Sequence, residues 1–256
     1  MSHRFNRQGF QVGQRRILIG GGPLTPAIKG IIVTCVTVFL IQTILTATLG
    51  QDPLSTLFGL SSKTVLTSFW VWQPVTYLFL HGGLLHIVFN MLFLWMFGTE
   101  LERRWGAQAF VQFYLFCGIG AGLTSILLDP VAHLFGFGEA WVSARATVGA
   151  SGAIYGVMAA QAILFPDKLL LLFLVIPMRM RQAVLLLAGI MLFTQLTTPG
   201  SGVNNVAHLG GMVFAWLYLR RVWNLRRLWA DWRWRVRRKK YRVVADIRDD
   251  DRFHYH

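Results

Sequence analysis

The stretch GIIVTCVTVFLIQTILTATL, residues 30–49, contains no aspartate, glutamate, lysine or arginine. A helix needs about 20 predominantly apolar residues to cross the hydrocarbon core of a bilayer, so this stretch predicts a transmembrane helix. The composition agrees with this prediction, because 54% of the residues are hydrophobic and only 14% are charged, against about 25% charged residues in a typical soluble domain. We therefore expect an all-α, polytopic membrane protein.

Six apolar stretches are predicted to form its spans: residues 30–49, 84–98, 107–128, 150–165, 182–196 and 203–219. The first and third are long enough to cross a bilayer, and the others are short, which is expected of helices inside a bundle or in a thinned bilayer. A further apolar run, residues 169–180, is interrupted by Pro177 and Arg179. This run is either an extended loop or the start of the fifth span.

Lysine and arginine alternate between rich and poor connections along the chain. The segment before the first span holds five of them and the next connection only Lys63, and the alternation continues to a tail that holds 13 of the 25, counted from Arg220. Cytoplasmic connections are enriched in Lys and Arg, so we predict six spans with both termini cytoplasmic. Three parts follow from this topology: a basic segment, the membrane domain and a basic, Trp- and Arg-rich tail, at residues 1–29, 30–220 and 221–256.

The net charge of +14 has two explanations, nucleic-acid binding or contact of the basic ends with anionic lipid headgroups. Basic flanks on apolar spans are what membrane topology requires, so the sequence predicts lipid contact and no nucleic acid, with protein binding by the tail as the alternative. Cys35 and Cys117 lie inside apolar stretches and are expected to be small buried side chains. We expect no disulfide, no metal site and no cofactor.

Polar side chains are costly inside a bilayer and are therefore candidates for function. His86 and Asn90 lie four residues apart near the start of the second span, Ser151 begins the fourth span, and His208 lies early in the sixth. In the predicted topology these three spans run from outside to inside, so all four side chains fall near the outer ends, at one depth. A lone serine or histidine in such a helix is usually structural, and the shared depth is what favours a site.

Small residues surround Ser151 and follow His208. They allow helix backbones to approach closely, so we predict that the Ser151 hydroxyl and the His208 imidazole form a hydrogen bond. These small residues are Gly149, Gly152 and Gly156 in the fourth segment and Gly211 and Ala215 in the sixth.

A serine hydroxyl becomes a nucleophile when a base accepts its proton, and histidine suits this role because its pKa lies near neutrality. His86, Asn90 and the backbone N–H of Ser151 are candidate donors to a developing oxyanion. The acidic residues outside the tail lie in connections or at span ends, which favours a Ser-His dyad over a triad. A transporter or channel is disfavoured, because the spans lack charged residues arranged as a relay or a pore ring.

Three segments, in this order, resemble the rhomboid intramembrane serine proteases: HGGLLHIVFN, GASGAIYG and AHLGG, at residues 81–90, 149–156 and 207–211. The resemblance covers about residues 30–220 and implies a six-helix bundle. It also implies that Ser151 is the nucleophile and His208 the general base, and that His86 and Asn90 stabilise the oxyanion.

The same resemblance implies supporting roles for other residues. His81 matches a structural position near a water-accessible cavity, and Tyr155 matches an aromatic residue that packs on the base histidine, although a core tyrosine is the alternative. Glu102 and Arg104 resemble a Glu-x-Arg element that holds the first loop or the helix ends. Trp72 and Gln73 stand where some members have Trp-Arg, so no loop interaction that needs that arginine is expected.

The resemblance also implies that the protein cleaves single-span membrane proteins within or near the outer part of their transmembrane helix. The short N-terminal segment and the absence of an organelle-type transit signal predict a bacterial cytoplasmic membrane. Segments with Gly, Pro or small polar residues are the expected targets, because their helices unwind easily. The alternative is a catalytically inactive relative that binds membrane proteins or acts in their quality control.

Overall fold

The computed structural model describes residues 22–134, 146–172, 176–197 and 204–220 of the chain. Most of residues 1–29 and all of the tail from residue 221 therefore lie outside the described residues. The long helices are α1 (Pro26–Leu49), α5 (Leu84–Phe93), α6 (Thr99–Trp105), α7 (Ala107–Leu134), α8 (Ser151–Leu164), α9 (Met180–Thr197) and α10 (Asn205–Arg220). Each predicted span thus falls on a helix.

The second span is longer than predicted. A π-helical turn at Leu94–Gly98 joins α5 to α6, and the helix ends only at Gly106, whose φ is +83°. The sequence ELERRW contains good helix formers, so charge ends the apolar stretch without ending the helix. Among the described residues, three helices are long and apolar enough to cross a bilayer, and the second of them is Leu84–Trp105; the others are Pro26–Leu49 and Ala107–Leu128.

Of the run at residues 169–180, the described residues 169–172 and 176–179 are strands and not the start of the fifth span, so the mostly helical chain also contains a short sheet. β1 (Leu169–Leu172) and β2 (Ile176–Arg179) pair as a two-stranded antiparallel sheet, with Leu169 opposite Arg179. Pro177 lies in β2, and proline lacks the N–H that a helix interior needs. The fifth span consequently begins after the sheet, at Met180.

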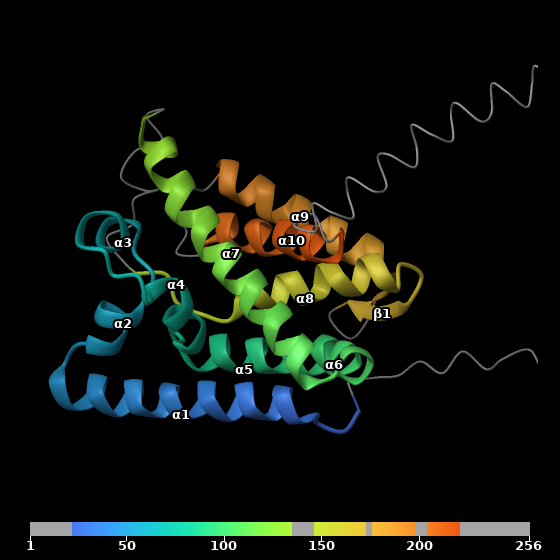
Figure 1. The fold of residues 1–256 in the computed structure, drawn as a ribbon, viewed down its shortest axis with the longest axis horizontal. Coiled ribbons are helices and arrows are strands. Elements are labelled where there is room, and N and C mark those ends of the chain that lie inside the picture. Colours follow the sequence, from blue (N-terminus) through green and yellow to red (C-terminus); the bar gives the residue numbers. More distant parts are fainter. Residues whose placement is uncertain (1–21, 135–145, 173–175, 198–203, 221–256) are drawn as a thin grey trace, which may run out of the picture.

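Helices α7, α8 and α10 pack against one another most extensively and form the centre of the molecule, with α1 along one edge beside α5 (Figure 1). Between α1 and α5 the chain forms three short helices, α2 (Pro53–Phe58), α3 (Ser62–Ser68) and α4 (Gln73–Thr76), and a 3₁₀ turn at Tyr77–Phe79. Gln73 is fully buried there and bonds to Ser61 N and Thr64 Oγ1, so a neutral amide organises this connection.

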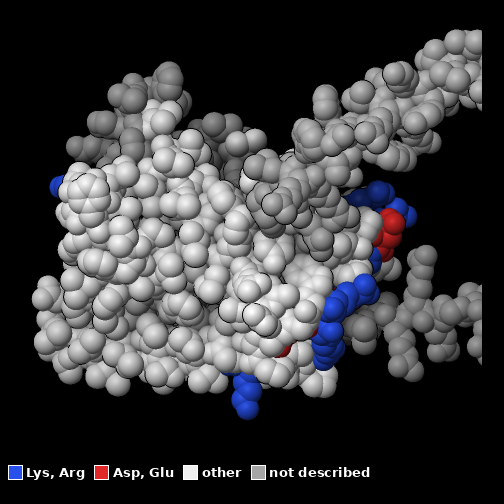
Figure 2. Space-filling model, viewed as in Figure 1, with Lys and Arg blue, Asp and Glu red and all other residues white. Residues whose placement is uncertain are grey.

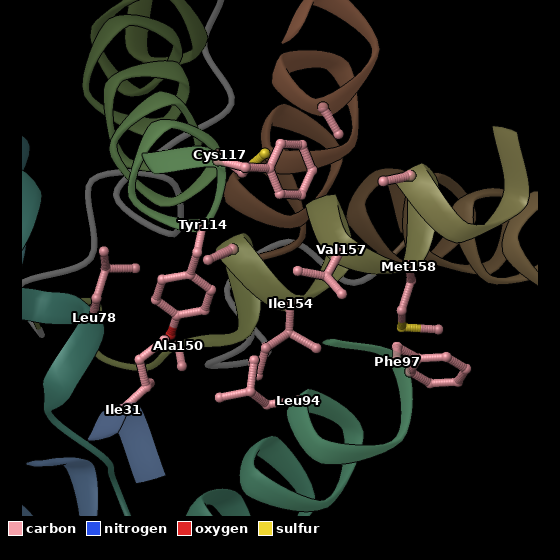
Figure 3. Close-up of a cluster of buried hydrophobic side chains, with 14 of the residues drawn as sticks. Ile31, Leu78, Leu94, Phe97, Tyr114, Cys117, Ala150, Ile154, Val157 and Met158 are labelled. Carbon is pink, nitrogen blue, oxygen red and sulfur yellow. The ribbon is translucent and has the colours of Figure 1, made fainter. Parts of the chain in front are cut away.

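Helix α8 is the innermost helix, since most of its residues from Gly152 to Gln161 are buried. In Figure 3, Ile154 of α8 points toward Leu94, and Met158 points toward Phe97 of the π-helical turn. This apolar contact fixes α8 against the helix that carries His86 and Asn90.

Charged side chains gather at one end of the molecule, around α6 and the β1–β2 sheet, whereas most of the visible face is free of them (Figure 2). Ion pairs at this end join Glu100 to Lys168 and Asp167 to Arg179. An apolar body with charges concentrated at an end is the distribution expected of a protein embedded in a bilayer.

Candidate active site

Ser151 is the first residue of α8 and follows an extended segment. In this segment Thr147 pairs with Leu60 through two backbone hydrogen bonds of 2.8 and 2.9 Å, and Gly149 N donates to Tyr77 O at 2.9 Å. Gly149 has a φ of +126°, and a Cβ there would lie 2.8 Å from Nε2 of His86. Only glycine fits this backbone conformation and leaves room for the imidazole.

His208 lies in the first turn of α10 and is 8% exposed. Its Nε2 atom lies 2.7 Å from Ser151 Oγ, which is a normal hydrogen-bond distance for such a pair. Its other ring nitrogen, Nδ1, has no hydrogen-bond partner among the described residues. Within the described part of the chain, the geometry is therefore that of a serine-histidine pair with no carboxylate hydrogen-bonded to the histidine.

Glycines make this short distance possible. A Cβ on Gly211 would lie only 1.9 Å from the carbonyl oxygen of Gly152, and a Cβ on Gly156 would lie 3.0 Å from the carbonyl oxygen of Gly211. Helices α8 and α10 are thus in backbone contact one turn below the Ser151–His208 pair. Tyr155 packs on the His208 ring with 4.5 Å between the ring centroids.

His86 and Asn90 lie on α5, and the His86 ring lies next to Gly149, just before the start of α8. Gly82 N donates to His86 Nδ1 at 3.3 Å, so a neutral imidazole carries its proton on Nε2, the atom that faces Gly149. Asn90 is 5% exposed, and its Nδ2 has no partner among the described residues. Both side chains therefore offer a donor, as an oxyanion site requires.

His81 lies in the connection just before α5, with its ring centroid 5.2 Å from that of His86. Burial, and to a lesser degree the neighbouring His86, lowers the pKa of His81 to about 4, so this imidazole is neutral near pH 7. Its backbone N–H donates to Gln42 Oε1 of α1 at 3.1 Å. The backbone of His81 consequently ties the start of α5 to α1.

Glu102 and Arg104 lie at the charged end of the molecule, far along the helix from His86. The buried Glu102 carboxylate accepts hydrogen bonds from Thr25 Oγ1 and from the backbone N–H groups of Ala27 and Ile28, which caps the start of α1. Arg104 lies over the ring of Phe165, 4.2 Å from its centroid, just after the end of α8. Two roles were predicted for Glu102 and Arg104, holding the first loop or holding the helix ends, and these contacts fit the second.

Two further polar side chains with hydrogen bonds between segments were not predicted from the sequence. Gln161, fully buried in α8, donates from Nε2 to Phe97 O in the π-helical turn at 2.7 Å. Asn204 lies just before α10 and bonds to residues of two other segments. A polar residue inside an apolar stretch is a general signal for function, and this signal could have identified Gln161. For Asn204 no signal existed, since polar residues are ordinary at span ends.

Comparison with known proteins gives one family. The model of the Rhomboid domain matches residues 68–224. Rhomboid protease GluP of Bacillus subtilis is 32% identical over 103 residues, 40% of this chain and 18% of that protein. Rhomboid protease GlpG of Serratia proteamaculans is 27% identical over 218 residues, 82% of this chain and 66% of that protein. Rhomboid protein 1, mitochondrial, of Saccharomyces cerevisiae is 33% identical over 141 residues, 55% of this chain and 38% of that protein. These matches therefore span from less than a fifth to just under two thirds of the relatives' lengths.

Proposed function

The chain belongs to the rhomboid family of integral membrane proteins, and on that premise we propose that it is an intramembrane serine endopeptidase working through a Ser151–His208 dyad. The single observation that carries the proposal is the 2.7 Å distance between Ser151 Oγ and His208 Nε2. A base within hydrogen-bond reach of a hydroxyl is the arrangement that makes serine a nucleophile.

In the proposed reaction, His208 Nε2 accepts the Ser151 proton as Oγ attacks the carbonyl carbon of the scissile amide. The imidazolium then gives that proton to the departing amine, which leaves an ester on Ser151. Water, deprotonated by the same imidazole, attacks the ester. The imidazolium returns this proton to Ser151 Oγ as the bond between Oγ and the acyl carbon breaks and the new carboxyl group is released. His208 Nδ1 has no partner among the described residues, which supports a dyad over a triad.

The negative charge that develops on the carbonyl oxygen needs donors that are already in place. We assign this role to His86 Nε2–H, Asn90 Nδ2–H and the backbone N–H of Ser151. The contact of the His86 ring with Gly149 and the unpartnered, buried amide of Asn90 support the assignment. Gly149 and Gly152 serve the site by leaving space, and Tyr155 by packing on the base.

For the topology we propose six spans, formed by α1, α5 with α6, α7, α8, α9 and α10, with both termini in the cytoplasm of a bacterial cell. The concentration of Lys and Arg at the end formed by α6 and β2 supports this orientation, as does the positive-inside rule. Ser151 then lies near the outer leaflet. Single-span membrane proteins are the proposed substrates, and the basic tail after residue 220 contacts anionic lipids.

The test is labelling and cleavage by the purified protein. Ser151→Ala and His208→Ala are each expected to lower cleavage of a reporter transmembrane substrate by at least about 10³-fold, and Ser151→Ala to abolish labelling by a fluorophosphonate. Ser68→Ala, at the exposed end of α3, is the matched control and should cleave and label like the wild type. Undiminished cleavage by the Ser151 variant would contradict the Ser151–His208 dyad. A wild type that neither labels nor cleaves would favour the inactive relative instead.

A further inference from the structure

The extended segment before Ser151 is held from two sides. On one side, Thr147 and Gly149 form backbone hydrogen bonds with Leu60 and Tyr77 of the connection between α1 and α5. On the other side, the Thr147 side chain accepts a hydrogen bond of 3.0 Å from Asn204 Nδ2, at the start of α10. Thr147 is therefore the point at which the nucleophile's segment meets the helix of the base.

Asn204 uses its whole side chain in such contacts. Its Oδ1 accepts a hydrogen bond from Ala207 N at 2.9 Å, which caps α10, and its Nδ2 also donates to Ser125 Oγ of α7 at 2.7 Å. The backbone carbonyl of Asn204 accepts a hydrogen bond from His208 N. The residue thus joins α7, α10 and the segment before α8, and it is linked to the base through one turn of helix.

The Asn204–Thr147 hydrogen bond lies at equal sequence separation from both reacting groups. Thr147 precedes Ser151 by four residues, and Asn204 precedes His208 by four. The glycine contact between α8 and α10 sets how closely the two helices approach. Because glycine has no side chain, this contact does not fix the position of one helix along the other. A hydrogen bond is directional, so this one can fix how far α10 slides or rotates along α8.

We propose that Asn204 is a positioning residue, which holds His208 Nε2 in line with Ser151 Oγ by binding Thr147 and Ser125. The proposal rests on the proposed protease function. A reacting group displaced by about 1 Å can cost about 10²-fold in rate, so a loosened α10 slows the chemical step. Substrate binding does not depend on the Ser151–His208 distance in the same way, so KM should change little.

Thr147→Val tests this, because it removes the acceptor hydroxyl while preserving side-chain shape, the Leu60 backbone pairing and the Asn204 cap on α10. Thr194→Val is the matched control: Thr194 of α9 accepts a hydrogen bond from Asn205 Nδ2 at 3.0 Å. The same substitution therefore breaks a bond of the neighbouring asparagine to α9 and not to the segment before Ser151. Initial rates on a reporter substrate, fluorophosphonate labelling rates and thermal midpoints are measured for both variants and for Asn204→Ala.

We expect Thr147→Val to lower kcat and the labelling rate about tenfold with KM within about twofold, Asn204→Ala to lower them at least as much, and Thr194→Val to resemble the wild type. Equal effects of the two valine variants would overturn the proposal, as would rates that fall only in proportion to folded protein. A normal Thr147 variant beside an inactive Ser151→Ala would overturn the positioning role alone. A wild type that does not cleave would overturn the protease function and this proposal together.

Discussion

At the scale of single residues, Gly149 shows how little freedom the site leaves. Its φ of +126° is costly for any residue with a Cβ, and that Cβ would collide with the His86 ring at 2.8 Å. The ring cannot move away freely, because Gly82 N binds its Nδ1. One added methyl group therefore disturbs both the segment before Ser151 and a proposed oxyanion donor.

We accordingly expect Gly149→Ala to lower kcat by about 10–100-fold, measured on a reporter substrate. Gly83→Ala is the control, because a Cβ at Gly83 meets nothing within 4 Å and its φ of 167° is open to any residue. It lies on the same helix start as His86 and should retain wild-type turnover. Equal activity of the two variants would mean that the His86–Gly149 contact has no part in the reaction.

At the scale of helices, the backbone contact between α8 and α10 is the feature that brings the dyad together. Gly211→Ala places a methyl group 1.9 Å from the Gly152 carbonyl oxygen, so the two helices must separate. Overpacking of this kind costs about 1–3 kcal/mol or more, and here it also lengthens the Ser151–His208 distance. We expect a lower thermal midpoint in detergent together with a loss of fluorophosphonate labelling.

Gly189→Ala of α9 is the comparison for that measurement. A Cβ at Gly189 meets nothing within 4 Å, and alanine is favoured over glycine in a helix by up to about 1 kcal/mol. This variant should be as stable as the wild type or more stable, and it should label normally. A Gly211 variant that behaves like the Gly189 variant would contradict tight α8–α10 packing.

The helices were predictable from sequence because each depends on a local apolar pattern. The extension of the second helix from Thr99 to Trp105 was not, since the charged sequence there leaves no apolar signal. The β1–β2 pair was not predicted either, because a short apolar run fits a strand or a helix by periodicity alone, and these strands form by pairing with each other, with Leu169 opposite Arg179. The apolar periodicity of a stretch therefore predicts a helix and its buried face, whereas the pairing of a strand depends on a second strand.

The same limit applies to the site. Ser151 and His208 stand out because serine and histidine are rare in these apolar helices, and the predicted topology brings them to one depth. Asn204 and Thr147 are ordinary polar residues at segment ends, and their hydrogen bond joins positions 57 residues apart. Only the folded backbone shows that the positions flanking the dyad are themselves in contact.

At the scale of the whole molecule, the placement of charge makes the orientation testable. Lys63 lies in the connection between α1 and α5 and Arg181 at the start of α9, and both are exposed. In the proposed topology Lys63 lies on the outer side with Ser151, whereas Arg181 faces the cytoplasm. Lys63→Cys should therefore react with a membrane-impermeant maleimide in right-side-out vesicles, and Arg181→Cys only in inverted ones.

The wild-type protein is the control, because Cys35 and Cys117 are both 0% exposed and should not react from either side. The Lys63 and Arg181 positions lie at opposite ends of the apolar helices, so the bilayer must separate them if the apolar surface faces lipid. Labelling of both variants from one side would contradict the membrane-spanning arrangement. Labelling with the two sides exchanged would preserve the bundle but place Ser151 at the cytoplasmic leaflet, which would change the part of a substrate's helix that reaches it.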